Sequence, residues 1–211
     1  MLKVAVLVSG GGTNLQAIID AIAAGTIKDA QISVVISNFE DVYALERAKN
    51  AGIKTQVVSK KGCCIGSDWE FRLAQAIKES GAELIVLAGF MSILSDDFVK
   101  KFEGKIINVH PSLIPSFCGE GFYGLKVHEA ALKKGVKVTG ATVHYVNSEV
   151  DGGEIILQKA VEVRKGDTPQ ALQKRVMEQA EWVILPQAIQ LIAEKEQAAA
   201  YMENTSCKLQ Y

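Results

Sequence analysis

The sequence lacks any apolar run that approaches the roughly 20 residues a membrane-spanning helix needs. It also lacks an excess of one charge, because 23 Lys and Arg residues offset 24 Asp and Glu residues and leave a net charge of −1. No field of one sign therefore favours a nucleic acid or an anionic membrane surface. We expect a soluble protein that has neither of them as a partner.

Cysteine and histidine patterns typical of metal sites are also absent from the sequence. The cysteines form no C-x-x-C pair, and two of them are adjacent, which suits neither a disulfide nor a metal. They are Cys63, Cys64, Cys118 and Cys207. With no H-x-x-x-H pattern and no His/Cys cluster, no metal site is predicted. The N-terminus enters a strand-like run at once, so we expect no signal peptide, reduced thiols and a cytoplasmic location.

Short apolar runs alternate with amphipathic segments in the first half of the chain. Strands are expected at residues 2–8, 31–37, 53–59, 83–88 and 105–109. Helices are expected between them, from about residue 15 onward and at residues 41–51, 67–80 and 95–102. This alternation predicts an α/β fold, a three-layer and mainly parallel twisted sheet with a Rossmann-like N-terminal half.

The pattern changes in the second half. Extended runs at residues 136–146 and 154–163, joined by a turn, predict an antiparallel hairpin added to the parallel sheet. A short helix is expected at residues 127–134, and a long C-terminal helix from Thr168, with Pro186 as a kink or break. No linker or internal repeat divides the chain. We therefore expect a single domain over residues 1–200 and a polar, poorly ordered tail over residues 201–211.

Asn108 and His110 lie at the end of the apolar run 105–109. Side chains alternate along a strand, so these two share one face, and an amide donor lies beside an imidazole. Asp151, in the turn of the expected hairpin, could close on them, although Asp-Gly-Gly by itself is an ordinary turn sequence. Amide, imidazole and carboxylate together suit an acyl transfer, in which an oxyanion forms and protons move. Asn108, His110 and Asp151 are the predicted catalytic residues.

A glycine-rich loop, SGGGTN from Ser9, lies between the first strand and the first helix. Backbone N–H groups and the helix dipole favour an anion there, so the loop predicts phosphate binding; a tight turn without a ligand is the alternative. A dinucleotide fits less well. Leu15 occupies the third glycine position of the fingerprint, and Asn38 ends the second strand where an acid would hold a ribose. The lysine of a Walker loop is also missing.

Two further histidines and a pair of glutamates lie outside these motifs. His144 alternates with Thr142 along its strand and is expected in a second layer behind the catalytic residues. His128, in the short helix, is expected as a surface or loop-packing residue. Glu178 and Glu181 are expected one helical turn apart on one face. Solvated charge is their default interpretation, and binding of sugar hydroxyls or an amine is the alternative.

Taken together, these segments resemble the folate-dependent formyltransferases, in the branch that acts on glycinamide ribonucleotide. The resemblance runs from Lys3 to about Ile192. It rests on SGGGTNLQAI from Ser9, LAGFM from Leu87, NVHPSL from Asn108 and VDGG from Val150. It implies transfer of the formyl group of 10-formyltetrahydrofolate to the amine of 5′-phosphoribosylglycinamide in purine biosynthesis, without a metal. It also implies that Asp151 keeps His110 protonated.

The resemblance assigns binding residues by position. The substrate phosphate would be held by Gly12, Thr13 and Asn14, and the rest of the ribonucleotide would be contacted by Glu181 with Glu178. Folate would lie against residues 91–94, the catalytic strand end and the loop 147–151. These folate-binding residues are Met91, Ser92, Ile93, Leu94, Asn108, Asn147, Ser148, Glu149, Val150 and Asp151. A monomer and a homodimer are both compatible with this assignment.

Three features depart from the family pattern. Ser92 stands in place of an arginine, Trp182 follows Glu181 in place of a histidine, and residues 118–123 form a longer segment than in many relatives. No arginine for the folate glutamate is evident at residues 60–70. The alternative interpretations are a formyltetrahydrofolate hydrolase, another folate formyltransferase, or a non-enzymatic module that binds a phosphate ligand. We do not expect the first two, because such relatives carry an additional domain.

Overall fold

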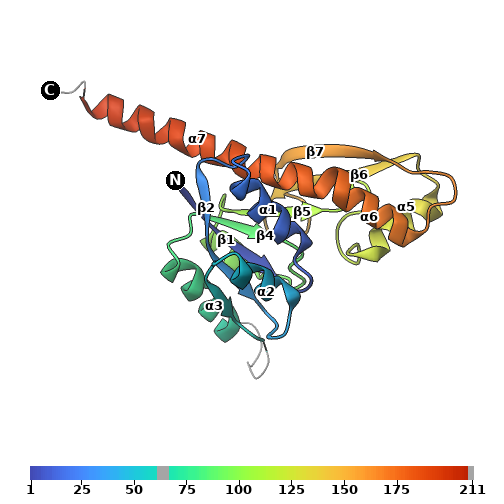
Figure 1. Ribbon diagram of the computed structural model, residues 1–211, viewed down its shortest axis with the longest axis horizontal. Helices are drawn as coiled ribbons and strands as arrows, with labels where there is room; N and C mark the ends of the chain where they lie inside the picture. Colours follow the sequence, from blue (N-terminus) through green and yellow to red (C-terminus); the bar gives the residue numbers. More distant parts are fainter. Residues whose placement is uncertain (61–66, 209–211) are drawn as a thin grey trace.

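A computed structural model of the chain describes residues 1–60 and 67–208, with the backbone alone for Ser67 and residues 203–208 (Figure 1). Strands and helices alternate through the first half as predicted, with boundaries shifted by a few residues. They are β1 (Leu2–Val8), α1 (Thr13–Ala23), β2 (Ala30–Ser37), α2 (Tyr43–Asn50), β3 (Thr55–Val57), α3 (Ser67–Glu79), β4 (Leu84–Leu87), α4 (Asp96–Lys101) and β5 (Ile106–His110). The shortfall is largest at β3, where only Thr55–Val57 pair with β2.

The second half contains α5 (Leu125–Lys134), β6 (Val138–Tyr145), β7 (Ile155–Glu162), α6 (Pro169–Val176), the π-helical turn η1 (Met177–Glu181) and α7 (Trp182–Lys208). All strands join one seven-stranded sheet in the order β3-β2-β1-β4-β5-β6-β7. The pairs from β3 to β5 are parallel, and β6 is antiparallel to both β5 and β7. The α/β fold with an added antiparallel hairpin is therefore confirmed.

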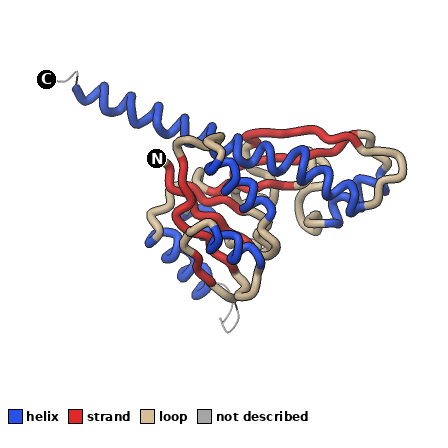
Figure 2. The backbone as a smooth tube through the Cα atoms, viewed as in Figure 1, coloured by secondary structure: helices blue, strands red, loops and turns tan. Residues whose placement is uncertain are grey.

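Helices cover both faces of the sheet, which makes three layers (Figure 2). Alternate residues of β1 enter two different cores because strand side chains point to opposite faces. Val4 and Val6 pack with α1, α2 and α7, whereas Ala5 and Leu7 pack with α3 and α4. The strand order reverses between β1 and β4, so the carboxyl ends of these two strands form the place where open α/β sheets bind ligands.

The C-terminal helical region is interrupted earlier than predicted. Helix α7 continues through Pro186, and the irregularity is the π-helical turn η1 that precedes it. The ring of a helical proline crowds the carbonyl four residues back. For Pro186 that residue is Trp182, the first residue of α7, so the crowded carbonyl lies at the junction with η1. Beyond Ala200 the helix runs on to Lys208, and Figure 1 shows this end projecting from the body. In the described part of the chain, no helix combines the length and apolar character needed to cross a membrane.

The connection from β6 to β7 makes a tight turn over residues 146–154. Asp151 adopts φ +57°, a left-handed conformation that is uncommon for a residue other than glycine. Gly153 passes so close to β6 that an added Cβ would overlap the carbonyl oxygen of Tyr145. Glycine at this position lets the turn close against the sheet, which determines where Asp151 lies.

Candidate active site

Asn108 and His110 lie at the carboxyl end of strand β5. Pro111, which has no N–H for a further ladder bond, follows directly. In the register between β5 and β6, Asn108 lies opposite His144 and His110 lies opposite Thr142. The structure thus places an amide and an imidazole on one face at a strand end, and it adds the ring of His144 from the neighbouring strand.

The turn before β7 brings Asp151 to both histidines. Its Oδ2 lies 3.4 Å from His110 Nδ1, and its Oδ1 lies 3.6 Å from His144 Nε2. The Gly119 N–H donates to Oδ2 at 2.9 Å. Burial raises the pKa of the Asp151 carboxyl, but the hydrogen bond with His144, the charge of His110 and the Gly119 N–H outweigh it, so the pKa is lowered. Asp151 is therefore a carboxylate at neutral pH.

The two nitrogens of His110 face different partners. Nε2 lies 2.9 Å from the Phe117 carbonyl oxygen, and because a carbonyl only accepts, Nε2 carries a hydrogen. Burial lowers the pKa of His110 and outweighs Asp151 and the Phe117 carbonyl, which raise it. Both ring nitrogens thus face acceptors, and the expectation that Asp151 keeps His110 protonated stays a prediction. The carboxylate acts on the His110 pKa in the expected direction, and desolvation of the ring acts against it and is the larger effect.

His144 connects Asn108 to the backbone of β6. Its Nδ1 lies 2.8 Å from the Tyr145 carbonyl oxygen, so this nitrogen donates. Nε2 lies 3.3 Å from the Asn108 amide nitrogen and 3.6 Å from Asp151 Oδ1: without a hydrogen it accepts from Asn108, and with one it donates toward Asp151. When Asn108 donates to His144, one of its two amide hydrogens is used in this bond, and the other remains for a ligand.

His128 does not lie at the surface, which corrects the sequence expectation. It is fully buried in α5, and neither ring nitrogen has a hydrogen-bond partner among the described residues. Burial and then the nearby His110 ring lower its pKa to about 4. The residue three positions on, Ala131, is also buried, and i, i+3 residues share a helix face. This spacing is the signal that would have placed His128 inside.

The glycine loop depends on glycine at Gly12, the residue before α1. Gly12 adopts φ +70° before α1, and an added Cβ would overlap Ala44 of α2. Arg47, also from α2, donates from Nε to the Gly11 carbonyl at 2.8 Å and from a terminal nitrogen to Gln16 at 3.0 Å. Arg47 thus adds a cation beside the loop. It was not singled out in the sequence, because a single arginine in an amphipathic helix is ordinary.

The side chains of the two residues after Gly12 lie in different surroundings. Asn14 donates from Nδ2 to Glu181 Oε2 at 2.8 Å, and both side chains are buried. Burial raises the pKa of Glu181, against the lowering effect of the Asn14 hydrogen bond. Thr13 instead lines a cavity of about 500 Å³ between α1 and α7, together with Arg47 and Trp182.

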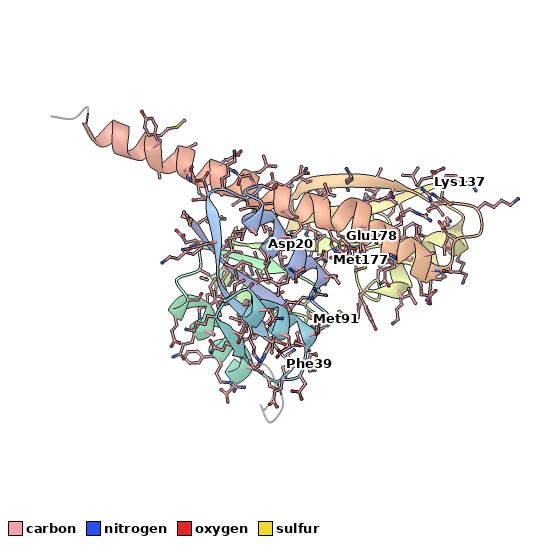
Figure 3. All side chains as sticks on the ribbon, viewed as in Figure 1. Asp20, Phe39, Met91, Lys137, Met177 and Glu178 are labelled. Carbon is pink, nitrogen blue, oxygen red and sulfur yellow. The ribbon has the colours of Figure 1, made fainter. Side chains whose placement is uncertain are left out.

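Glu178 and Glu181 do not share a face, contrary to the expectation from α-helical spacing. Both lie in η1, whose i→i+5 hydrogen bonds widen the turn, so three residues no longer complete it. Glu181 points inward, and Glu178 faces solvent near Lys174, 3.8 Å away. In Figure 3 Glu178 and Met177 lie along the outer helical layer. The structure therefore joins Glu181, but not Glu178, to the glycine loop.

Two segments assigned to folate follow the strands on either side of β5, whose end holds the cluster of Asn108, His110 and Asp151. Residues 91–94 follow β4, with Met91 and Ile93 exposed and Leu94 packed against the core beneath α3 and α4. Residues 147–151 precede β7, and Val150 is exposed there. These exposed side chains are the apolar surface beside the cluster. Ser148 and Glu149 complete the turn, which Asn147 closes by donating to the Gly152 carbonyl at 3.2 Å.

The remaining predictions concern cysteine and metal sites. Cys118 is a free cysteine, and its Sγ lies 3.2 Å from the Pro115 carbonyl oxygen. Cys63 and Cys64, the side chain of Cys207 and much of the stretch 60–70 lie outside the described residues. Within the described residues, no group of His, Cys, Asp and Glu side chains is arranged to hold a metal ion.

Comparison with known proteins gives extensive matches. A phosphoribosylglycinamide formyltransferase of Haemophilus influenzae is 42% identical over 194 residues, which cover 92% of this chain and 88% of that protein. The structure of glycinamide ribonucleotide transformylase 1 from Symbiobacterium toebii aligns with a TM-score of 0.86 and 41% identity, over 92% of this chain and 89% of that one. The human trifunctional purine biosynthetic protein adenosine-3 is 47% identical over 191 residues, 90% of this chain.

The extent of these matches separates two kinds of relative. This chain spans only 18% of the length of the human trifunctional protein, and the same share of its chicken counterpart. It spans most of the length of the bacterial formyltransferases. Residues 2–189 match the family described as formyl transferase, a range that contains β1 to β7 and the cluster of Asn108, His110 and Asp151. The chain therefore belongs to the formyl transferase family.

Proposed function

We propose that the chain transfers the formyl group of 10-formyltetrahydrofolate to the amine of 5′-phosphoribosylglycinamide, a step of purine biosynthesis. The proposal is carried by the cluster of Asn108, His110 and Asp151 at the end of β5, in a chain that matches a bacterial enzyme of that name over most of its length. The substrates are small molecules. The protein acts in the cytoplasm as a monomer or a homodimer.

The folate supplies the formyl carbon and leaves as tetrahydrofolate. The segments 91–94 and 147–151 fit such a ligand, because a pterin needs an apolar wall with a few fixed polar groups. Met91, Ile93 and Val150 are 55%, 76% and 51% exposed and supply the wall. The free amide hydrogen of Asn108 and the carboxylate of Asp151 lie beyond them, where the formyl group would arrive.

Asn108 and His110 are the donors for the oxyanion that forms when the amine attacks the formyl carbon. No nucleophilic side chain is needed, since the amine forms the new C–N bond itself. Asn108 has one amide hydrogen free, whereas the His110 Nε2–H is held by the Phe117 carbonyl. That hydrogen must leave the neutral carbonyl for the oxyanion, and a hydrogen bond to a charged acceptor is the stronger of the two.

Asp151 and His110 are placed to carry the proton. When the bond to the leaving folate nitrogen breaks, the proton lost by the amine must reach that nitrogen. Asp151 remains charged at neutral pH and raises the pKa of His110 against the effect of burial. It therefore stabilises the ring whenever the ring takes up a proton. The carbonyl of the formyl group re-forms in the product.

The ribonucleotide phosphate binds at the N-terminus of α1. Gly12, Thr13 and Asn14 contribute N–H groups that have no partner inside the helix, and the helix dipole adds a favourable field. Glu181, held by Asn14, lies at the same end of the helix and is the carboxyl that would meet the rest of the substrate. Glu178 faces solvent near Lys174, so we assign this role to Glu181 and not to Glu178.

The test is to follow the loss of the formylfolate with and without 5′-phosphoribosylglycinamide. We expect turnover only with the amine, and one N-formyl product for each folate consumed. Asn108→Ala should reduce kcat about 100–1,000-fold, because it removes one oxyanion donor. Loss of the formyl group without the amine would identify a hydrolase. Binding of both ligands without turnover would leave a non-enzymatic binding module.

A further inference from the structure

A chain of hydrogen bonds links the glycine loop to the folate segment. Ser9 donates from its hydroxyl to Asn38 Oδ1 at 2.7 Å, and Asn38 donates from Nδ2 to the Ser92 hydroxyl at 3.0 Å. The Met91 N–H donates back to the Ser9 hydroxyl at 2.8 Å. The Asn38 side chain thus accepts through Oδ1 and donates through Nδ2, and the Ser9 hydroxyl both donates and accepts. We call Ser9, Asn38 and Ser92 the polar bridge.

The polar bridge crosses the reversal point of the sheet. Ser9 follows β1, Asn38 follows β2, and Ser92 lies a few residues after β4. Asn38 is only 6% exposed, and a buried amide that loses a partner is strongly disfavoured. Its two hydrogen bonds therefore fix a definite distance between the strand ends. Figure 3 shows Phe39, the next residue, and Met91 at the same edge of the molecule.

The bridge supplies hydrogen bonds at the start of the segment 91–94, directly after Phe90, which packs against the core and stacks on Trp69. Met91 and Ile93 are exposed, so their side chains contribute little core packing. The far end is fixed independently, because Leu94 packs against the core and the Ser95 N–H donates to Glu70 at 2.7 Å. Ser9 and Asn38 therefore supply the hydrogen bonds that orient Met91 and Ser92, between the packed residues Phe90 and Leu94.

Ser9 also begins the glycine loop. The carbonyls of the next two residues accept hydrogen bonds from α2: Gly10 from the Ala44 N–H at 3.1 Å and Gly11 from Arg47 Nε at 2.8 Å. An added Cβ on either glycine would meet nothing within 4 Å, so no side-chain packing restrains this part of the loop. A phosphate bound at the N-terminus of α1 would restrain this loop further, and with it Ser9. The hydroxyl of Ser9 would pass that restraint to Met91 directly and to Ser92 through Asn38.

We propose that the polar bridge positions the two substrate-binding segments relative to each other, so that the ribonucleotide at the glycine loop strengthens folate binding at residues 91–94. Asn38 and Ser92 are positioning residues in this scheme, since they act through the segment and the loop. The inference rests on the proposed function, which assigns the two ligands. By linkage, folate must strengthen ribonucleotide binding by the same factor.

The experiment measures the Kd of tetrahydrofolate by titration calorimetry, alone and with saturating 5′-phosphoribosylglycinamide. This pair lacks a formyl group, so no turnover occurs. We expect the ribonucleotide to tighten folate binding at least about 5-fold in the wild type, the lower end of ordinary coupling between sites. Ser92→Ala and Asn38→Leu both remove the hydrogen bond between Asn38 and Ser92, so each should reduce the factor by about 2-fold or more, and the double variant should reduce it no further than Asn38→Leu alone.

Two controls separate coupling from general loosening. Ser92→Thr keeps the hydroxyl and should keep the wild-type factor. Ser95→Ala loosens the far end of the same segment without touching the bridge, so it should weaken folate binding with and without the ribonucleotide and leave the factor unchanged. Thermal unfolding confirms that each variant is folded.

The outcomes distinguish the inference from the proposed function. A wild type that binds both ligands independently, or a Ser92→Ala variant that keeps the wild-type factor, overturns the role of the polar bridge and leaves the proposed function intact. A wild type that binds neither ligand overturns the proposed function, and this inference with it.

Discussion

At the scale of single residues, His110 is held between an acceptor on the backbone and a carboxylate. Phe117, whose carbonyl faces Nε2, adopts φ +52°, so a strained residue positions the acceptor. Burial favours the neutral ring, and Asp151 opposes it. The balance between these two effects decides how readily the ring takes up a proton during the reaction.

Asp151→Asn changes this balance without changing the size of the side chain. The pKa of His110 should fall further, because the raising effect of the carboxylate is lost and burial remains. We expect kcat to drop at least about 100-fold near neutral pH. Substrate affinity should change far less. An NMR titration of the three histidines beside a pH–rate profile checks both effects. An unmoved His110 pKa would show that Asp151 does not tune the ring.

His128 should make stability depend on pH. The folded protein leaves this ring neutral down to a pKa of about 4, whereas the unfolded chain protonates it near 6.5. Between these values the unfolded state binds more protons, so the free energy of unfolding falls as the pH falls. The full interval corresponds to about 3 kcal/mol.

His128→Leu removes this titration and should flatten the dependence. The measurement is urea unfolding of both proteins at pH 7 and at pH 4.5. The wild type should lose more stability between the two values than the variant does. Equal losses would mean that the buried ring is protonated in the folded state as well.

At the scale of elements, the turn between β6 and β7 depends on one glycine. Gly153→Ala places a methyl group on the Tyr145 carbonyl oxygen, so the turn must move. We expect a loss of at least about 2 kcal/mol, equivalent to a Tm lower by about 4–8 °C. Gly10→Ala is the matched control, since an added Cβ there meets nothing within 4 Å, and its Tm should stay near the wild-type value. Equal Tm values for both variants would show that the turn adapts freely.

The helical elements show where sequence periodicity is informative and where it is not. Residues 15–22 repeat apolar side chains at helical spacing, and α1 forms there. The π-helical turn η1 leaves no such signal, because a turn one residue wider does not change the composition of the segment. The expectation that Glu178 and Glu181 share one face was wrong for this reason.

At the scale of the whole molecule, the sheet could be predicted but several contacts of the site could not. Apolar runs bounded by glycine and polar residues are a local signal, and they gave β1, β2, β4 and β5. The Asn14 contact with Glu181 joins residues 167 positions apart, and the Phe117 and Gly119 contacts use backbone atoms that any residue carries. The sequence was enough to predict which side chains belong to the site. The backbone groups that orient them became evident only in the folded chain.

Ligand binding should raise the stability of the entire fold. With 5′-phosphoribosylglycinamide at 100 times its Kd, the free energy of unfolding should rise by about 2.7 kcal/mol. The dephosphorylated substrate at the same concentration should have little effect, because the N-terminus of α1 is an anion site. Thermal unfolding with each compound measures the difference. Equal protection by both compounds would place the phosphate elsewhere.

The hydrogen bond from His110 to Phe117 also determines how fast one particular hydrogen is replaced from solvent. The residue is only 4% exposed, so its Nε2–H reaches water only when that bond opens. After transfer to deuterium oxide, this hydrogen should outlast those of surface groups. Because the proposed reaction must open the same bond, addition of substrates should hasten its loss. The rate of deuterium exchange at His110 Nε2 would then report how often this hydrogen bond opens, rather than how often the reaction occurs.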